Sequence, residues 1–286
     1  MKDGLIISFL RVIPKKPIAR FMGMNARLEL PTFMQKWIIR YFVWKYDVNL
    51  GECTGSIEDY NSLAQFFIRE LKPGRRPIDD SPDSITSPVD GRVHTFGPIV
   101  DGSFEQYDDQ IGSVAEMLGV SEDSTIAQRY NSGQFIIIYL SPQDYHRVHS
   151  HDTGIITDLS YFPGQLWPVF PAATRKIPHL FDRNERLVFR IQDPKHPDIE
   201  SSIALIGAFG VGRMTTDWDP VITNNSEPTK SIEIRQEIQK GAELGRFELG
   251  STVVLFFEPN QIAEWTIQRG QKIQLGTLMA KMTPSK

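Results

Sequence analysis

Residues 248–257 read Glu-Leu-Gly-Ser-Thr-Val-Val-Leu-Phe-Phe, and here a polar step leads directly into a long apolar run. Val253 to Phe257 is made of β-branched, aromatic and aliphatic residues, which predicts a buried strand. Gly250 and Ser251 stand at the tight start of that strand. Glycine has no Cβ, so the backbone there can be strained and the Ser251 hydroxyl brought close to the preceding carbonyl. By itself, a Gly-Ser-Thr step is typical of an ordinary turn.

Similar short apolar runs recur from residue 85 onward, with turns between them. The predicted strands are 134–140, 155–162, 186–191, 202–211, 232–238 and 252–257. We expect helices over residues 5–13, over residues 32–46, from Leu63 to Leu71 with Ser62 as the cap, and over residues 112–118. These elements predict an α+β protein, with N-terminal amphipathic helices on a mostly antiparallel β core that resembles a barrel-sandwich.

Length, cysteine content and net charge restrict the class of protein. A chain of 286 residues can form one large domain, or a core with a small appendage. Cys53 is the single cysteine, which excludes an internal disulfide and a cysteine-based zinc site. The net charge of -4 provides no general attraction to nucleic acid, so we expect no nucleic-acid partner.

Positive charge is concentrated near the N-terminus. Residues 1–47 contain nine Lys and Arg against three Asp and Glu, a local charge of +6 that leaves -10 for the remainder. Within 32–46, large apolar residues at helical spacing alternate with basic ones. This pattern fits a helix packed on the core with solvated charges, and it equally fits a helix lying in the interface of an anionic bilayer.

The chain has no run of about 18 apolar residues, so we expect no segment that spans a membrane. Leu5 to Leu10 is too short for the core of a signal peptide and is followed by Arg11. These features predict an intracellular protein that is peripheral if it binds a membrane.

Two further segments supply side chains that could activate a hydroxyl. Asp90 lies in a Ser-Pro-Val-Asp-Gly step, and His149 ends the run Ser-Pro-Gln-Asp-Tyr-His-Arg-Val-His. With Ser251 they provide an acid, a histidine and a serine. Taken singly, Asp90 is typical of a turn and a histidine is more often structural than catalytic. Their combination with the Gly-Ser step favours a catalytic interpretation.

The histidines also raise the possibility of a metal site. His146 and His149 are separated by two residues, and His151 is close by. A zinc site would need further ligands and would leave Ser251 without a role, so we expect no metal.

Several sequence islands together identify a family. They are Pro88-Val-Asp-Gly91, the run from Tyr139 to His149, Pro163-Gly164, Asn184-Glu-Arg186, and Gly245-Arg-Phe-Glu-Leu-Gly-Ser-Thr252. In this order, over residues 60–280, the chain resembles phosphatidylserine decarboxylases of the bacterial and mitochondrial type. One departure lies between Gln106 and Gly119. The family usually has Lys-Gly and later Tyr-Ser-Leu there, whereas this chain reads Tyr-Asp-Asp-Gln-Ile-Gly-Ser-Val.

The resemblance implies a precursor, or zymogen, that cuts itself between Gly250 and Ser251. His149, oriented and kept basic by Asp90, would take the proton of Ser251, whose oxygen then attacks the Gly250 carbonyl. Elimination releases the Gly250 carboxylate and converts Ser251 into a covalent pyruvoyl cofactor. The products would be a β chain of residues 1–250 and an α chain of residues 251–286.

The implied reaction converts phosphatidylserine to phosphatidylethanolamine and carbon dioxide. The pyruvoyl ketone would hold the substrate amine and accept the electron pair left by carbon dioxide, with no metal or diffusible cofactor. His146 is the candidate proton donor to the resulting carbanion. The resemblance also implies a homodimer of αβ units.

The implied substrate and the charge pattern together predict how the chain is divided and where in the cell the protein acts. Residues 1–60 would form a helical membrane-associating segment, and residues 61–286 a β-rich catalytic domain. Because leaflets that contain phosphatidylserine are anionic, we expect a peripheral protein at the cytoplasmic face of the cell membrane.

Other functions fit some of the same residues. A serine hydrolase could use Ser251, His149 and Asp90 on an intact chain, although no Gly-x-Ser-x-Gly elbow surrounds Ser251. A non-enzymatic lipid-binding module would bind liposomes without cleavage. A third alternative keeps the pyruvoyl chemistry but acts on another amino acid or serine lipid.

Overall fold

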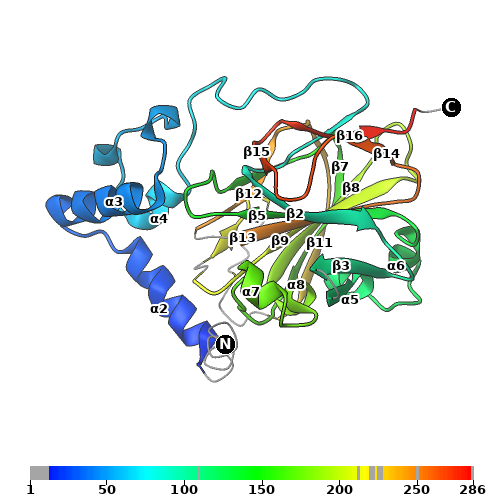
Figure 1. The fold of residues 1–286 in the computed structure, drawn as a ribbon, viewed down its shortest axis with the longest axis horizontal. Coiled ribbons are helices and arrows are strands. Elements are labelled where there is room, and N and C mark those ends of the chain that lie inside the picture. Colours follow the sequence, from blue (N-terminus) through cyan, green and yellow to red (C-terminus); the bar gives the residue numbers. More distant parts are fainter. Residues whose placement is uncertain are drawn as a thin grey trace.

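The computed structural model describes residues 13–107, 110–210, 213–218, 223, 228–248 and 251–284 (Figure 1). The helices are α2 Lys15–Arg27, α3 Thr32–Tyr46, α4 Leu63–Phe67, α5 Val114–Leu118, α6 Thr125–Arg129, α7 Pro171–Thr174 and α8 Leu180–Arg183. The strands are β1 Ser84–Thr86, β2 Gly91–Pro98, β3 Ser103–Tyr107, β4 Gln110–Ser113, β5 Gln134–Leu140, β6 Arg147–His149, β7 Gly154–Phe162, β8 Arg186–Gln192, β9 Glu200–Ile206, β10 Met214–Thr215, β11 Lys230–Ile238, β12 Glu243–Phe247, β13 Ser251–Phe257, β14 Ile262–Trp265, β15 Lys272–Ile273 and β16 Leu278–Met282.

The core is an eight-stranded sheet in the order β11-β7-β8-β9-β13-β5-β2-β15. Strand β13 lies in its interior, and Val254 is opposite Ala204 of β9 on one side and Ile137 of β5 on the other. Residues 253–257 are buried, as expected for a strand with neighbours on both sides. The apolar run after Ser251 therefore forms part of the centre of the fold.

Three smaller sheets complete the β core. They are β1-β16-β14, β10-β12-β6 and the β3-β4 pair. The paired strands are antiparallel, as in β13 with β5 and β12 with β6. The α+β class with sandwich-like sheets is thus confirmed, although the sheets do not close into a barrel within the described part of the chain.

Several predicted elements are confirmed closely. The predictions for residues 32–46 and 134–140 match α3 and β5 at both ends. Ser62 caps α4 as expected, because its hydroxyl accepts the Gln65 N–H at 3.2 Å. Strands β7, β8, β11 and β13 lie within one or two residues of their predicted limits.

Other predicted boundaries are wrong. Helix α4 ends at Phe67 rather than Leu71, because Leu71 forms a β-bridge with Cys53. The predicted strand 202–211 leaves the sheet after Ile206. Helix α5 begins at Val114, because the two residues before it belong to β4.

Two other N-terminal segments, residues 5–13 and α2, also bear on the predicted helices. The helix predicted over 5–13 lies outside the described residues, except for Ile13. Helix α2 was missed by the sequence analysis, because Pro17 and Gly23 within it lower its apparent helical propensity.

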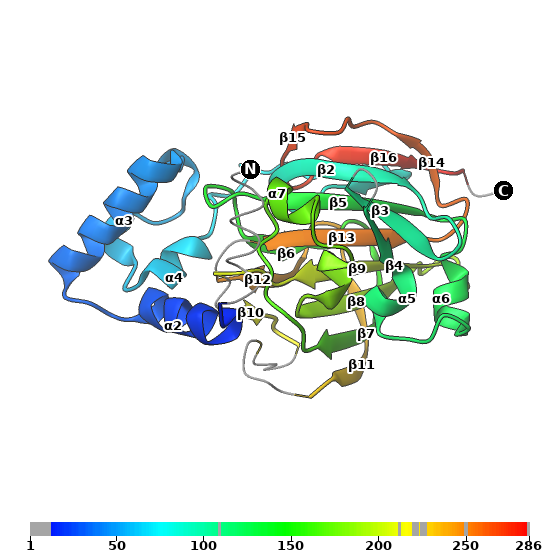
Figure 2. The ribbon, with the colours of Figure 1, turned by 60° about the horizontal axis from the view of Figure 1, so that its bottom comes forward.

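Helices α2, α3 and α4 lie at one end of the β core (Figures 1 and 2). Helix α3 has one face in a small apolar cluster, where Ile39 is fully buried and Phe42 lies edge-on to Phe66 at 6.1 Å. Its opposite face carries Trp37 and Trp44, which are 68% and 77% exposed. Helix α3 therefore packs through one face and exposes large aromatic side chains on the other.

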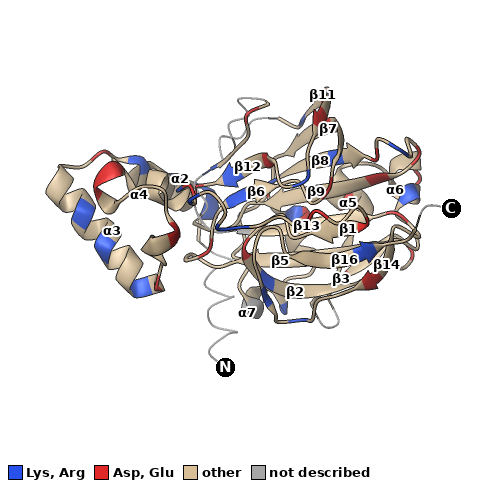
Figure 3. Ribbon diagram, turned by 90° about the horizontal axis from the view of Figure 1, so that it is seen from above, with Lys and Arg blue, Asp and Glu red and all other residues tan. Residues whose placement is uncertain are grey.

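Figure 3 shows basic residues spaced along α3. Exposed apolar residues continue onto α2 and the link after it, at Phe21, Met24 and Leu28. No helix in the described part of the chain has the length and apolar character needed to cross a bilayer.

Candidate active site

Ser251 is the first residue of β13 and is opposite Leu140, the last residue of β5. After Leu140 the chain forms the loop of residues 141–146, which leads into β6. Strand β6 pairs with β12, the strand that precedes Ser251 in the sequence, and the Phe247 N–H donates to the His146 carbonyl at 2.9 Å. The histidine loop is therefore held against the chain on both sides of the predicted cleavage site. Gly250 and the side chain of Ser251 lie outside the described part of the structure.

The His149 ring has both nitrogens in hydrogen-bonding distance of defined partners. Nδ1 donates to the Gly241 carbonyl at 2.9 Å, because a carbonyl can only accept. Nε2 is 3.2 Å from the hydroxyl of Tyr145, and in this tautomer Nε2 accepts a hydrogen bond from that hydroxyl. Burial lowers the pKa of His149 below its ordinary value. His149 is therefore neutral near pH 7, with the lone pair of a base on Nε2.

Tyr145 and Gly241 were missed by the sequence analysis. Tyr145 lies in the same run as the two histidines, and its phenol could have been considered as a partner. Burial raises the Tyr145 pKa, so the hydroxyl keeps its proton. Gly241 contributes only a backbone carbonyl, for which no side-chain pattern could have served as a signal.

The His146 ring is completely buried and lies against Phe67, with ring centroids 4.0 Å apart. Its Nδ1 donates to the Asp144 carbonyl at 2.8 Å. Burial lowers the pKa of His146 to about 3. Its Nε2 has no hydrogen-bond partner among the described residues, so His146 presents an uncommitted acceptor in a dry environment.

The Asp90 carboxylate is engaged by groups other than the histidines. It accepts from Arg76 Nε and Nη2 at 2.8 and 2.6 Å, and from the Leu275 N–H at 2.8 Å. Arg76 also binds Glu52 at 2.8 Å. The structure thus brings Asp90 near the site without a hydrogen bond to His149 among the described contacts. Its charge raises the His149 pKa, less than burial lowers it.

A cavity of about 450 Å³ lies beside these residues. Asp90 and Tyr145 line it, together with Arg69, Arg76 and Lys272. Because the Tyr145 hydroxyl also contacts His149, this residue connects the cavity wall with the proposed base.

Two buried polar atoms near the start of β13 are without partners in the described part of the chain. They are Nε2 of His146 and Oγ1 of Thr252, the residue directly after Ser251. Successive side chains of a strand point to opposite faces of the sheet, so the Thr252 hydroxyl lies on the opposite face from position 251. The unpartnered His146 Nε2 is therefore the atom of the two that the histidine loop supplies.

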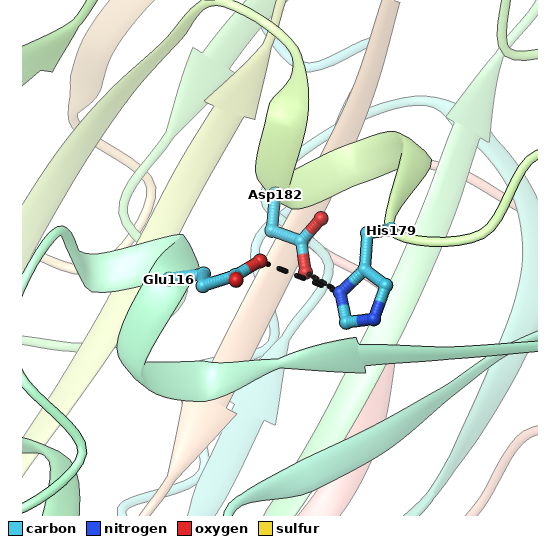
Figure 4. A group of neighbouring side chains, drawn as sticks. All are labelled: Glu116, His179 and Asp182. Carbon is cyan, nitrogen blue, oxygen red and sulfur yellow. Dashed lines mark hydrogen bonds and ion pairs between the residues drawn. The ribbon is translucent and has the colours of Figure 1, made fainter.

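In the described part of the chain, His146, His149 and His151 do not gather as metal ligands. His151 points into the core, where its Nε2 is 2.9 Å from the Ser201 hydroxyl. In the described ranges, one other group has ligand-like spacing, namely Glu116, His179 and Asp182 (Figure 4).

Hydrogen bonds account for this second group. His179 Nδ1 lies 2.9 Å from Asp182 Oδ2 and 3.4 Å from Glu116 Oε2. The same Asp182 oxygen accepts the Ser113 N–H at 2.9 Å. These contacts join α5, α8 and the end of β4.

Comparison with known proteins adds a direct result. Residues 63–281 match the family model described as phosphatidylserine decarboxylase. The chain is 37% identical to the phosphatidylserine decarboxylase proenzyme of Myxococcus xanthus, over 99% of this chain and 100% of that protein. It is 36% identical to the proenzymes of the same name from Marinobacter nauticus (95% of this chain, 97% of the relative) and Brevibacillus brevis (98% and 99%).

Proposed function

The chain belongs to the phosphatidylserine decarboxylase family, and we propose that it decarboxylates phosphatidylserine with a pyruvoyl group made from its own Ser251. One observation carries the mechanism: Ser251 begins the central strand β13 beside the segment 141–149, which carries His146 in its loop and His149 at the end of β6. The name proenzyme, borne by the relatives, fits a chain that is made as a precursor. Family membership does not favour a serine hydrolase or a non-enzymatic lipid-binding module.

In the proposed self-cleavage, His149 Nε2 takes the proton of the Ser251 hydroxyl. The serine oxygen attacks the carbonyl carbon of Gly250, and the peptide C–N bond breaks as an ester forms. Removal of the Ser251 α-proton then expels the Gly250 carboxylate and leaves dehydroalanine. Tautomerisation and addition of water replace the nitrogen, which leaves as ammonia, with a ketone oxygen.

Gly241 and Asp90 would support the base in this step. The Gly241 carbonyl holds the proton on Nδ1, so that Nε2 is the atom available to the serine. The negative charge of Asp90 favours the protonated imidazole that forms during the attack. Asp90 is therefore proposed to stabilise His149 electrostatically.

The pyruvoyl group, once formed, supplies an electron sink for the pair of electrons left by carbon dioxide. His146 is the proposed donor of the proton that replaces the carboxyl group. Since burial keeps His146 neutral, it must acquire that proton during the reaction.

Intact mass and product analysis test the proposed function. We expect two fragments, residues 1–250 and 251–286, with the smaller one blocked by a pyruvoyl group and reactive toward carbonyl reagents. The purified protein should release phosphatidylethanolamine from phosphatidylserine. A single full-length mass with unmodified Ser251 would remove the cofactor and, with it, this mechanism.

The two products are proposed to stay together after cleavage. Strand β13 would belong to the α chain, but it lies between β9 and β5 of the β chain. Strand β16 likewise pairs with β1. Cutting at the start of β13 leaves these ladders intact, so the chains should separate only on denaturation. A homodimer of such αβ units is a further proposal, which sedimentation of the processed protein would test.

The N-terminal helices are proposed to bind the membrane, as the first of two parts, residues 1–60 and 61–286. Trp37 stacks on Tyr41 with centroids 6.0 Å apart, and Trp44 follows at 5.9 Å from Tyr41. An exposed aromatic row flanked by basic residues suits the interface of an anionic leaflet. The protein would therefore act at the cytoplasmic face of the cell membrane, where its diacyl substrate lies.

Replacing Trp37 and Trp44 by Ser should weaken binding to phosphatidylserine vesicles by about tenfold or more, because two large apolar side chains no longer enter the bilayer. Self-cleavage should continue at the wild-type rate. Cosedimentation with vesicles measures the first effect and gel analysis the second. Val100→Ser with Ile111→Ser is the matched control, because these exposed apolar residues lie on the β core. Undiminished binding of the tryptophan variant would contradict the proposal.

Asp90→Asn should slow self-cleavage by about 10²-fold, because the protonated His149 loses its stabilising charge while the side chain keeps its shape. The rate is measured on newly synthesised precursor. Glu258→Gln is a suitable control, because it removes another carboxylate bound to an arginine, Arg129, at 2.6 Å. If both variants mature equally fast, Asp90 serves only to hold Arg76.

A further inference from the structure

Helix α2 contacts the catalytic core at three places along its length. At its start, Lys15 Nζ lies 3.8 Å above the Trp167 ring. In its middle, the Met22 methyl lies close to Gly210, 3.5 Å from where a Cβ on that residue would be. At its last residue, Arg27 Nη1 is 2.8 Å from Glu248 Oε2. Figure 2 shows α2 at the end of the core where β10 and β12 lie.

Glu248 is the last described residue before that site, and it is held twice. Its carboxylate, with the side chain only 12% exposed, binds Arg27. Its backbone N–H donates to the Arg213 carbonyl at 2.9 Å. On the other side of the site, Ser251 is fixed by the pairing of β13 with β5. The bond to be cut therefore lies between two anchored residues that are three positions apart.

We propose that Arg27 is a positioning residue for self-cleavage, which it serves by anchoring Glu248, two residues before Gly250 in the sequence. This inference rests on the proposed function. A largely buried carboxylate needs a charged or hydrogen-bonding partner, and without Arg27 the Glu248 side chain would turn toward water. Glu248 would then lose one of the two contacts that fix it just before the cleavage site. A displacement of about 1 Å can cost about 10²-fold in rate.

The Arg27–Glu248 ion pair joins two segments that are far apart in the sequence. Arg27 and Glu248 are separated by 221 positions, and Arg27 belongs to a helix whose outer side carries exposed Phe21 and Met24. The element proposed to meet the membrane is thus the one that holds the segment to be cut. Arg27 touches neither Ser251 nor the histidines in any contact described for it.

The test follows maturation of full-length precursor made by cell-free translation. Arg27→Gln and Glu248→Gln should each slow cleavage by about tenfold. The double variant should be no slower than the slower single one, because both changes remove the same contact. Arg27→Lys should recover most of the rate, since it restores the charge. Lys16→Gln, which removes the same charge from the other end of α2, should mature like the wild type.

Two outcomes would overturn the positioning role. One is that Arg27→Gln matures at the wild-type rate. The other is that the double variant is slowed by the product of the two factors by which the single variants are slowed. Thermal unfolding of the uncleaved background Ser251→Ala, with and without Arg27→Gln, separates a local effect from general instability. The reversed pair, Arg27→Glu with Glu248→Arg, tests the contact again if a single variant fails to fold.

The proposed function can fail independently. If the wild-type precursor is never cut, or if Ser251→Ala is still cut, the self-processing mechanism is wrong. If the wild type is cut, Ser251→Ala is not, and Arg27→Gln matches the wild type, only the role of Arg27 is wrong.

Discussion

Ser251→Ala is expected to give a single uncut chain with no decarboxylase activity. Alanine has no oxygen to attack the Gly250 carbonyl and nothing that can become the ketone, so both processing and catalysis are lost. Electrophoresis, intact mass and reaction with a carbonyl reagent measure the first loss. Release of carbon dioxide from phosphatidylserine measures the second. This is the largest effect expected of a single substitution.

Ser231→Ala provides the matched control for that experiment. It removes the same hydroxyl from β11, the edge strand of the same sheet, where Ser231 binds Ser160 at 3.0 Å. This variant should be cut and active. If the Ser251→Ala protein still appears as two fragments, cleavage occurs at another position in the chain. An uncut Ser251→Ala chain that still decarboxylates would exclude the pyruvoyl group.

The second large effect is expected for His149→Ala, which should mature at least about 10²-fold more slowly than the wild type. Without the imidazole, the Ser251 proton loses its proposed acceptor, the Nε2 atom that now accepts a hydrogen bond from the Tyr145 hydroxyl. Newly made precursor, sampled over hours, gives the rate. Addition of imidazole to the His149→Ala precursor should restore part of it.

His196→Ala is a useful control, because it removes a histidine from the loop between β8 and β9. It should mature normally. If His149→Ala matures as fast as this control, another group takes the Ser251 proton and the assignment of His149 is wrong.

The pH dependence of maturation follows from the same residue. The reactive form of His149 is the neutral one, and burial lowers its pKa below the usual value of about 6.5. Cleavage should therefore remain fast as the pH falls through 6.5 and decline only below it, as the imidazole gains a proton. Asp90→Asn should move this decline to still lower pH, because the charge that favours protonation is gone. A midpoint above 6.5 in the wild type would contradict the assignment.

The family and the strand that follows Ser251 could be predicted because both are carried by local patterns. The apolar run after Ser251 indicates a buried strand, whichever strands it pairs with. In the structure this strand is β13, which lies in the interior of the sheet between β5 and β9. The Gly-Ser step, Asp90 and the two histidines lie in short segments with recognisable residue types. The family islands are of the same kind, and the match over residues 63–281 confirms the resemblance they indicated.

Boundaries and helix faces were less predictable. Residues 68–71 are helical by local preference, but pairing of Leu71 with Cys53 draws them out of α4. On α3, large apolar residues occur on both faces, and the sequence could not divide them. Phe42 packs on Phe66 and Phe67, whereas Trp37 and Trp44 remain exposed.

By itself, the sequence determined the residue types of the site and the strand that carries Ser251, because both depend on neighbours along the chain. Only the tertiary structure decided which groups contact them. Asp90 binds Arg76, His149 binds the Gly241 carbonyl and Tyr145, and Glu248 binds Arg27 across 221 positions. These contacts form where segments that are distant in sequence come together in the fold. A local sequence pattern does not specify which segments these are.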